Sequence, residues 1–180
     1  QSGNTATCSQ TLTVDDNVAP VLVGLPGGNS MANGMTMTWD FEGSVTTGVS
    51  SQPTYAAASN AAVGAGLTGP TFPGGCSGSG EAFSASDWTN VPAANEYFEF
   101  VFTPQANTTF NLTNIAFQHR RSGTGPTTWQ VYVDGSLVDS DNNIGTSSTC
   151  GSESVNVNLN FPANVPVSVR IVGAGASGAA

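Results

Sequence analysis

The feature that most constrains this chain is the alternation of apolar and polar residues in several short segments. Segment 154–161 reads SVNVNLNF and segment 96–103 reads EYFEFVFT. In an extended strand every second side chain lies on the same face, so this pattern gives each segment an apolar face suited to a core. The sequence lacks the 3.6-residue periodicity of an amphipathic helix. It therefore predicts an all-β protein built from antiparallel strands.

The same pattern predicts further strands, separated by turn-forming residues. They span residues 35–42, 109–120, 127–134, 136–140 and 165–172. Asp134-Gly135 is a hairpin turn signal, and a shift in the alternation near Asn114 predicts a β-bulge. Segment 43–94 is rich in Gly, Ala, Ser and Thr, so we expect long surface loops there with one short strand.

The low charge of the chain excludes several kinds of partner. Charged residues are 8% of the sequence, lysine is absent, and the net charge is -9. Such a surface does not attract phosphate backbones or anionic membranes, so we expect no nucleic-acid partner. No run approaches the roughly 20 apolar residues that span a bilayer, so we expect no membrane insertion.

Two of the three cysteines lie in loops rich in glycine and serine. Cys76 is in PGGCSGSG and Cys150 is in TSSTCGSES, which favours a disulfide formed in an oxidising, extracellular compartment. Free thiols are the alternative. No cysteine has a second ligand at zinc-binding spacing. Cys8 is left over.

The N-terminal segment resembles the closing end of a hyalin-type (HYR) repeat, an immunoglobulin-like extracellular module. The matching runs are SGNTATCSQTLTV and DNVAP. The resemblance implies that residues 1–20 are the tail of such a module or an exchanged strand. Residues 21–34 then form a linker to a second unit.

Residues 35–180 resemble a jelly-roll, carbohydrate-binding-module-like domain of secreted and surface proteins of Bacteroidetes-type bacteria. The motifs are WDFE, YFEF, RRSGTGPTTWQVYVDG and VPVSVRIVGAGA. The resemblance implies an antiparallel jelly-roll β-sandwich at the cell surface. In that family a further strand usually follows GAGASGAA. Its absence here would leave an unpaired sheet edge.

This unpaired edge and the isolated N-terminal strand suggest strand exchange between molecules. Residues 5–14 alternate, with Gln10 as the exception, and would form an intermolecular strand that completes a neighbour's sheet. A trimmed protein is the other explanation. The residues of the predicted exchanged strand are Thr5, Ala6, Thr7, Cys8, Leu12 and Val14.

A structural calcium ion is the one cofactor that we expect. The family resemblance implies early ligands at Asp40 and Glu42. Asp139 and Asp141 alternate like part of a calcium loop but lack its full spacing. Solvated turns are the alternative for each.

Exposed aromatic residues are the candidates for sugar binding. Trp88 and Tyr132 are chosen for this role, whereas Trp39 and Trp129 are expected in the core. Tyr55 and Tyr97 are further candidates of the same kind.

The cluster of His119, Arg120 and Arg121 is expected to be structural. Strand alternation would point the two arginines to opposite faces, and one would pair with a carboxylate such as Glu99.

No catalytic arrangement is recognisable. The chain has one histidine and no nucleophile elbow, and its carboxylates qualify as glycosidase acids by type alone. We therefore expect a non-catalytic extracellular structural or adhesive module, a filament subunit joined by strand exchange to other copies. The alternative is a carbohydrate-binding module of a larger secreted enzyme or adhesin.

Overall fold

A computed structural model describes residues 30–31, 36–41, 47–76, 81–141, 144 and 149–177. The described residues form eleven strands and no helix. The strands are β1 Ser30–Met31, β2 Ala56–Ala58, β3 Ala62–Val63, β4 Thr68–Thr71, β5 Ser84–Ser86, β6 Phe98–Pro104, β7 Thr108–His119, β8 Thr128–Val133, β9 Ser136–Asp141, β10 Gly151–Phe161 and β11 Val167–Ala174. The predicted strand at 5–14 lies outside the described residues.

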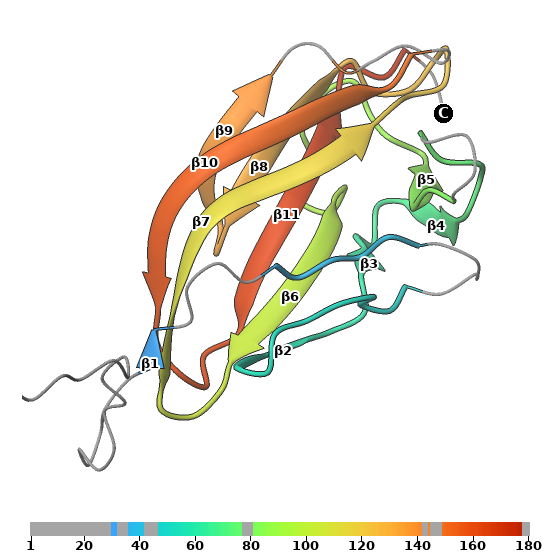
Figure 1. The fold of residues 1–180 in the computed structure, drawn as a ribbon. Helices are drawn as coiled ribbons and strands as arrows, with labels where there is room; N and C mark the ends of the chain where they lie inside the picture. The colour runs from blue at the N-terminus through green and yellow to red at the C-terminus, as the bar shows by residue number, and fades with distance from the viewer. Residues whose placement is uncertain are drawn as a thin grey trace, which may run out of the picture.

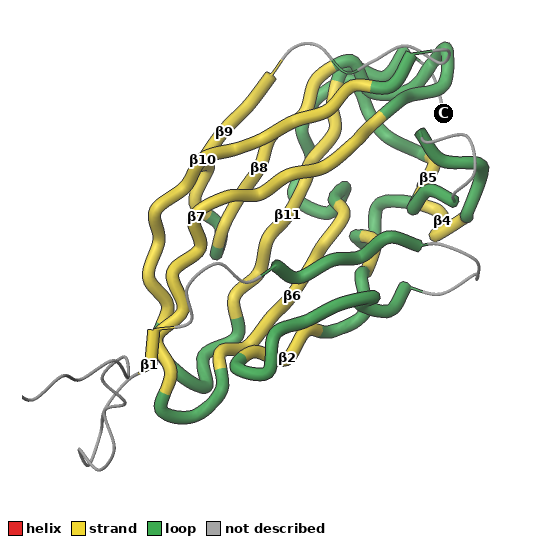
Figure 2. The backbone as a smooth tube through the Cα atoms, in the orientation of Figure 1, coloured by secondary structure: helices red, strands yellow, loops and turns green. Residues whose placement is uncertain are grey.

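Two sheets of unequal width face each other (Figures 1 and 2). The wide sheet has the order β2-β6-β11-β8-β9, with β3 also paired to β6. The narrow sheet consists of β7 and β10, with the two residues of β1 at its edge. A separate pair, β4-β5, stands beside them.

The strand connections make this an antiparallel jelly-roll sandwich, as the sequence predicted. From β6 onward the chain crosses between the sheets four times, at β6–β7, β7–β8, β9–β10 and β10–β11. The last strand, β11, inserts between β6 and β8, so neighbours in the sheet are distant in the sequence. The pairing of β1 with β7 is parallel and is the exception.

The core lies between the sheets and is made by the apolar faces that alternation predicted. Val131, Val155 and Val167 are almost fully buried. Phe102 of β6 and Phe110 of β7 bridge the two sheets, with ring centroids 4.9 Å apart. Hydrophobic burial on this scale drives the two sheets together.

The predicted bulge is present, but the extra residue is on the other strand. Asn114 pairs with Asn156 and Leu112 pairs with Leu159, so β10 has one residue more than β7 between these two pairs. The predicted hairpin turn is present too, with positive φ at both Asp134 (47°) and Gly135 (77°).

The first part of the chain differs from its prediction. The described residues 36–41 form a single bridge, Thr38 with Ser51, instead of a strand. The described residues of segment 43–94 form four short strands, β2 to β5, instead of one. Two of them, β2 and β3, add to the β6 edge through backbone hydrogen bonds, which small residues such as Ala56 make without showing any alternation.

Candidate binding cleft

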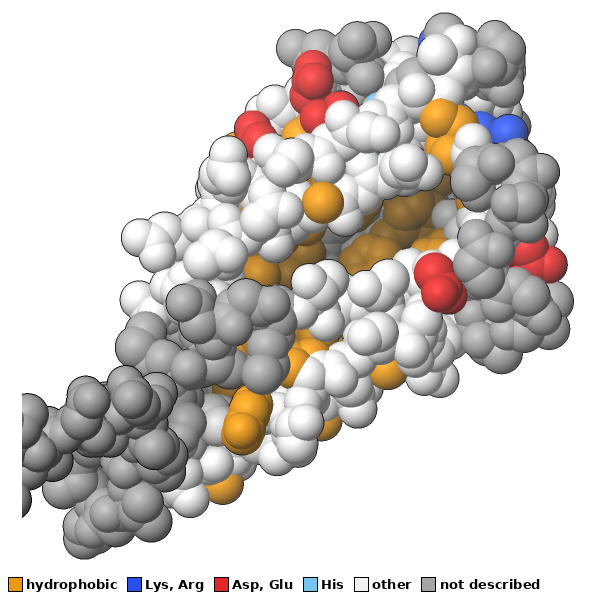
Figure 3. Space-filling model, viewed as in Figure 1, with side chains coloured by type: hydrophobic (Ala, Val, Ile, Leu, Met, Phe, Trp, Pro, Cys, Tyr) orange, Lys and Arg blue, Asp and Glu red, His pale blue; other side chains and the backbone are white. Residues whose placement is uncertain are grey.

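An apolar cleft of about 1590 Å³ opens between β7 and the wide sheet. Figure 3 shows this hollow with hydrophobic side chains at its floor. Its apolar walls come from both sheets and from the segment that carries Trp39. They include Met37, Trp39, Phe83, Phe98, Phe100, Leu112, Ile115, Phe117, Trp129, Val169 and Ile171.

The cleft is open because the narrow sheet does not cover the wide one. On one side β7 pairs with β10 along its length. On its other side, among the described residues, β1 alone pairs with it, at Thr108 and Thr109. From Phe110 onward this edge of β7 has no described strand beside it, so apolar side chains beneath it remain accessible.

Aromatic rings make one wall of the cleft. Trp39 meets Phe100 edge to face at 5.2 Å, and its indole N–H donates to the Ser59 carbonyl at 3.0 Å. Phe41 stacks on Phe83 at 4.9 Å with an interplanar angle of 12°. Phe41 has a φ of 57°, which is unusual for a bulky residue.

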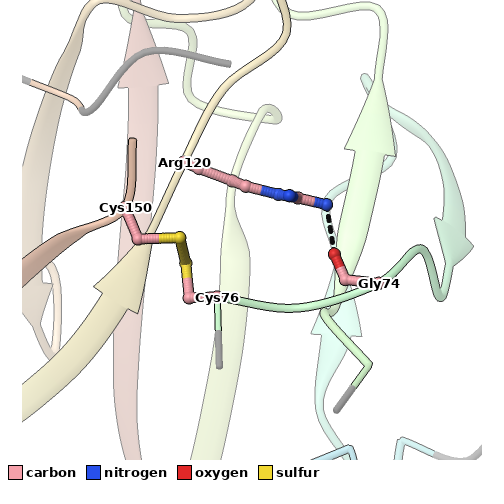
Figure 4. Close-up of a disulfide and its surroundings, with 4 residues drawn as sticks. All are labelled: Gly74, Cys76, Arg120 and Cys150. Carbon is pink, nitrogen blue, oxygen red and sulfur yellow. Dashed lines mark hydrogen bonds between the residues drawn. A yellow bond between two sulfur atoms is a disulfide. The ribbon is translucent and has the colours of Figure 1, made fainter. Parts of the chain in front are cut away.

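A disulfide lies at one side of the cleft (Figure 4). Cys76 and Cys150 are bonded, with their Cα atoms 5.6 Å apart, and Cys76 lines the cleft. The Arg120 guanidinium donates to the Gly74 carbonyl beside it. These two links tie the loop after β4 to the β7–β10 sheet. The disulfide is the one that the two cysteine loops predicted.

The two neighbouring arginines share one cleft, which corrects the sequence interpretation. Both Arg120 and Arg121 line it. Alternation assigned them to opposite faces, but β7 ends at His119 and the rule does not extend past the strand. Arg121 donates to the carbonyls of Ser122 at 3.1 Å and Gly123 at 3.2 Å.

The predicted partner of Glu99 was also wrong. Its carboxylate accepts hydrogen bonds from Arg170 Nε at 2.8 Å and from Ser168 Oγ at 2.7 Å. Arg170 also lies 4.2 Å above the ring of Tyr97. Burial favours a higher pKa of Glu99, but these hydrogen bonds and the charge of Arg170 outweigh it, so the pKa is lowered.

His119 joins the two strands of the narrow sheet beside the cleft. Its Nε2 lies 3.0 Å from Glu153 Oε1, and both residues line the cleft. Glu96 is buried, and its carboxylate accepts hydrogen bonds from the backbone N–H and the hydroxyl of Thr89. The contacts of Glu96 and Glu99 are therefore structural ones.

Two tryptophans, the predicted binding residue Trp88 and the predicted core residue Trp39, both line the cleft. Trp88 is more buried than was expected of a binding residue, at 7% exposure, and its ring packs on Phe98 with the centroids 5.2 Å apart. Trp39, expected in the core, is half-buried at the cleft wall. The pattern could not show this, because it identifies an apolar face but not whether another sheet covers it.

Among the remaining aromatic residues, Trp129 lies in the core, as expected. It is buried in the core at 3% exposure and also lines the cleft. Tyr132 is half-buried, does not line the cleft, and donates to Gln130 at 2.9 Å. Tyr55 is exposed and likewise lies outside the cleft.

Calcium binding stays a prediction. Asp40 is exposed and lines the cleft, whereas Glu42 lies outside the described residues. Asp139 and Asp141 are on β9, where Asp139 accepts the backbone N–H of Ser140 at 2.8 Å. Within the part of the chain that the structure describes, no three histidine, cysteine or acidic side chains gather as metal ligands.

No helix in the described part of the chain is long and apolar enough to cross a membrane.

Comparison with known proteins gives limited similarity. No protein-family model matches the chain, and no curated protein matches it by sequence. One solved structure that resembles it is a family 35 carbohydrate-binding module from Clostridium thermocellum, at 16% identity. The match covers 69% of this chain and 84% of that one, with a TM-score of 0.33. The fold assignment therefore rests on the strand order described above.

Proposed function

We propose that this protein is a non-catalytic, extracellular module that binds carbohydrate in the cleft between β7 and the wide sheet. The observation that carries the proposal is the open cleft walled by Trp39, Phe41, Phe83 and Phe100. Flat aromatic rings suit the apolar C–H faces of sugars, and polar groups at the rim suit their hydroxyls.

The size of the cleft favours an oligosaccharide over a single sugar. Its volume of about 1590 Å³ exceeds the roughly 300–1,000 Å³ of a typical small-molecule site. Polar side chains also line the cleft, among them Asp40, Gln118 and Arg121. A chain of several sugars would use both the rings and these groups.

An extracellular location fits the covalent chemistry. The Cys76–Cys150 disulfide is typical of proteins that fold in an oxidising compartment. The net charge of -9 and the absence of lysine favour neutral partners over nucleic acid. Glycans, and other copies of this chain or neighbouring modules, are the partners that we propose.

A binding assay with two aromatic variants tests the carbohydrate proposal. Trp39→Ala should weaken binding to a soluble oligosaccharide, first identified on a glycan array, by about tenfold or more, as removal of a tryptophan at the centre of a site usually does. Tyr55→Ala is the matched control, because Tyr55 is 43% exposed but lies outside the cleft.

The assay needs two further conditions. Titration calorimetry is run with calcium and with a chelator, which also tests the proposed ion at Asp40 and Glu42. No binding to any glycan on the array, or equal losses in both variants, would exclude the cleft as a carbohydrate site.

The second candidate is a structural or adhesive module that associates with copies of itself. The specific observation in its favour is the edge of β7, where Phe110–Gln118 has no described strand beside it. An edge of this kind readily pairs with another chain. Concentration-dependent sedimentation of the purified chain is the direct measurement.

A further inference from the structure

Two links join the walls of the cleft at one end of β7. The Cys76–Cys150 disulfide connects the loop after β4 to the start of β10 (Figure 4). Arg120, the residue after β7, donates to the Gly74 carbonyl in the same loop. The pairing of β7 with β10 ends at His119, so both links lie at this end of the two strands. Because Cys76 and Arg120 both line the cleft, the linked loop bounds this end of it.

The opposite end of the cleft is closed by the sandwich itself. β6 and β7 belong to different sheets, and the turn between Pro104 and Thr108 joins them. Phe102 and Phe110 line the cleft near this turn, and their ring centroids are 4.9 Å apart across the two sheets. Among the described residues, the cleft is therefore bounded at both ends and open along the edge of β7 (Figure 3).

The chemistry of the lining changes along β7. Leu112, Ile115 and Phe117 give the middle of the cleft an apolar wall, whereas the residues at the linked end are polar. There Arg121 donates to two carbonyls of its own loop and pairs with no carboxylate in the part of the chain that the structure describes. Ser122 lines the same end. Hydrogen-bonding groups are thus concentrated where the cleft is closed.

A closed polar end distinguishes the end of a glycan chain from its interior. An interior sugar is joined to a neighbour on both sides, so a chain lying along β7 would collide with the linked loop. A terminal sugar continues in one direction only and carries an additional free hydroxyl. A site that hydrogen-bonds this hydroxyl discriminates against a sugar in which it is blocked, because the polar groups of the site then remain unpaired.

We propose that the cleft holds the end of a glycan chain, with the terminal sugar beside Arg121 and the preceding sugars against the aromatic wall. The inference rests on the proposed carbohydrate function and names the part of a glycan that the site accepts. Interior segments of a polysaccharide are excluded by the linked loop.

The stoichiometry of binding to polymers tests this proposal with the unmodified protein. Linear gluco-, xylo- and manno-oligosaccharides are compared with long polymers of the same sugars by titration calorimetry. One protein should bind per polymer chain, so the binding capacity per gram should fall in inverse proportion to chain length. Several proteins per chain would overturn the inference but keep carbohydrate binding. No binding to any glycan on the array would overturn the proposed function and the inference with it.

Modification of each end of a bound oligosaccharide gives a second measurement. Reduction to the alditol alters one end, and a methyl ether on the terminal hydroxyl alters the other. One modification should weaken binding by about tenfold or more and the other, the matched control, by less than about twofold. Equal effects of the two modifications would overturn the inference.

Arg121→Met tests the position of the terminal sugar. The ratio of the affinities for the two modified forms should fall to less than about threefold, because the group that recognises the terminal sugar is gone. This ratio is measured within one variant, so it does not depend on the fraction of folded protein. An unchanged ratio would overturn the placement of the terminal sugar beside Arg121.

Discussion

Glu99 and Arg170 form an ion pair across the β6–β11 pairing, at register positions that face each other. Alternation places both on the face of the sheet away from the phenylalanines, where Tyr97 also lies. The hydrogen bonds from Arg170 and Ser168 favour the ionised carboxylate, against the opposing effect of burial, and lower the pKa of Glu99. The pair therefore holds β11, the last strand in the sequence, against β6.

The pH dependence of this pair is a testable consequence. A carboxyl whose pKa is lower in the folded state adds stability above its unfolded pKa of about 4.3, and this is lost as pH falls through the folded pKa. Glu99→Gln should lower the free energy of unfolding by about 0.5–1 kcal/mol at pH 7, since the pair is partly exposed. The difference from wild type should shrink below about pH 4. Urea unfolding at several pH values measures it, and a constant difference would contradict the assignment.

At the scale of elements, the β8–β9 hairpin shows how local sequence sets strand pairing. Asp134-Gly135 joins the two strands with positive φ at both positions, and β8 lies between β11 and β9. A turn of this type matches the right-handed twist of its strands. The turn therefore sets the pairing next to it, Val133 with Ser136 and Tyr132 with Leu137, and the register shifts before Val131.

Two glycine substitutions separate backbone conformation from packing in this hairpin. A Cβ at Gly135 would meet no atom within 4 Å, but φ there is +77°. Gly135→Ala should therefore destabilise the fold by about 1 kcal/mol through the backbone alone. Gly123→Ala is the control, because Gly123 has equal space and no positive φ. The midpoint of thermal unfolding should fall for Gly135→Ala alone. An equal fall for both variants would exclude this explanation.

At the scale of the whole molecule, the disulfide connects parts that the sheets leave apart. Cys76 lies between β4 and β5, and Cys150 lies just before β10. The two residues are 74 positions apart in the sequence. Together with the Arg120 contact to Gly74, the bond holds one wall of the cleft against the other.

Removal of this bond should both destabilise the protein and alter the cleft. In the chain-entropy account, a bridge closing a loop of this length contributes roughly 4 kcal/mol. The double variant Cys76→Ser/Cys150→Ser should lose about that much in denaturant unfolding, and any glycan binding should weaken with it. A reductant should reproduce the loss in the wild type and have no effect on the variant. Unchanged stability would show that the sheets alone hold the β4–β5 segment in place.

Much of the fold could be predicted from the sequence, because the alternation within a strand shows which of its faces is buried. The alternation in β6, β8 and β10 predicted those strands and most of their inward residues, since a period of two reflects local geometry. The Asp134-Gly135 turn and the disulfide could be predicted for the same reason, because each has a signal in a short stretch of sequence. Short strands of alanine and glycine, such as β2, carry no such signal because their pairing comes from β6.

The cleft was decided by the tertiary structure. Alternation showed that Trp39 and Phe117 belong to apolar faces, but not that the narrow sheet leaves part of the wide sheet uncovered. Nor could it show that Trp88 is buried, or that both arginines line one cavity beyond the end of β7. The sequence by itself determined which side chains avoid water. Which of them are covered depends on how many strands each sheet contains and on the order in which distant segments pair.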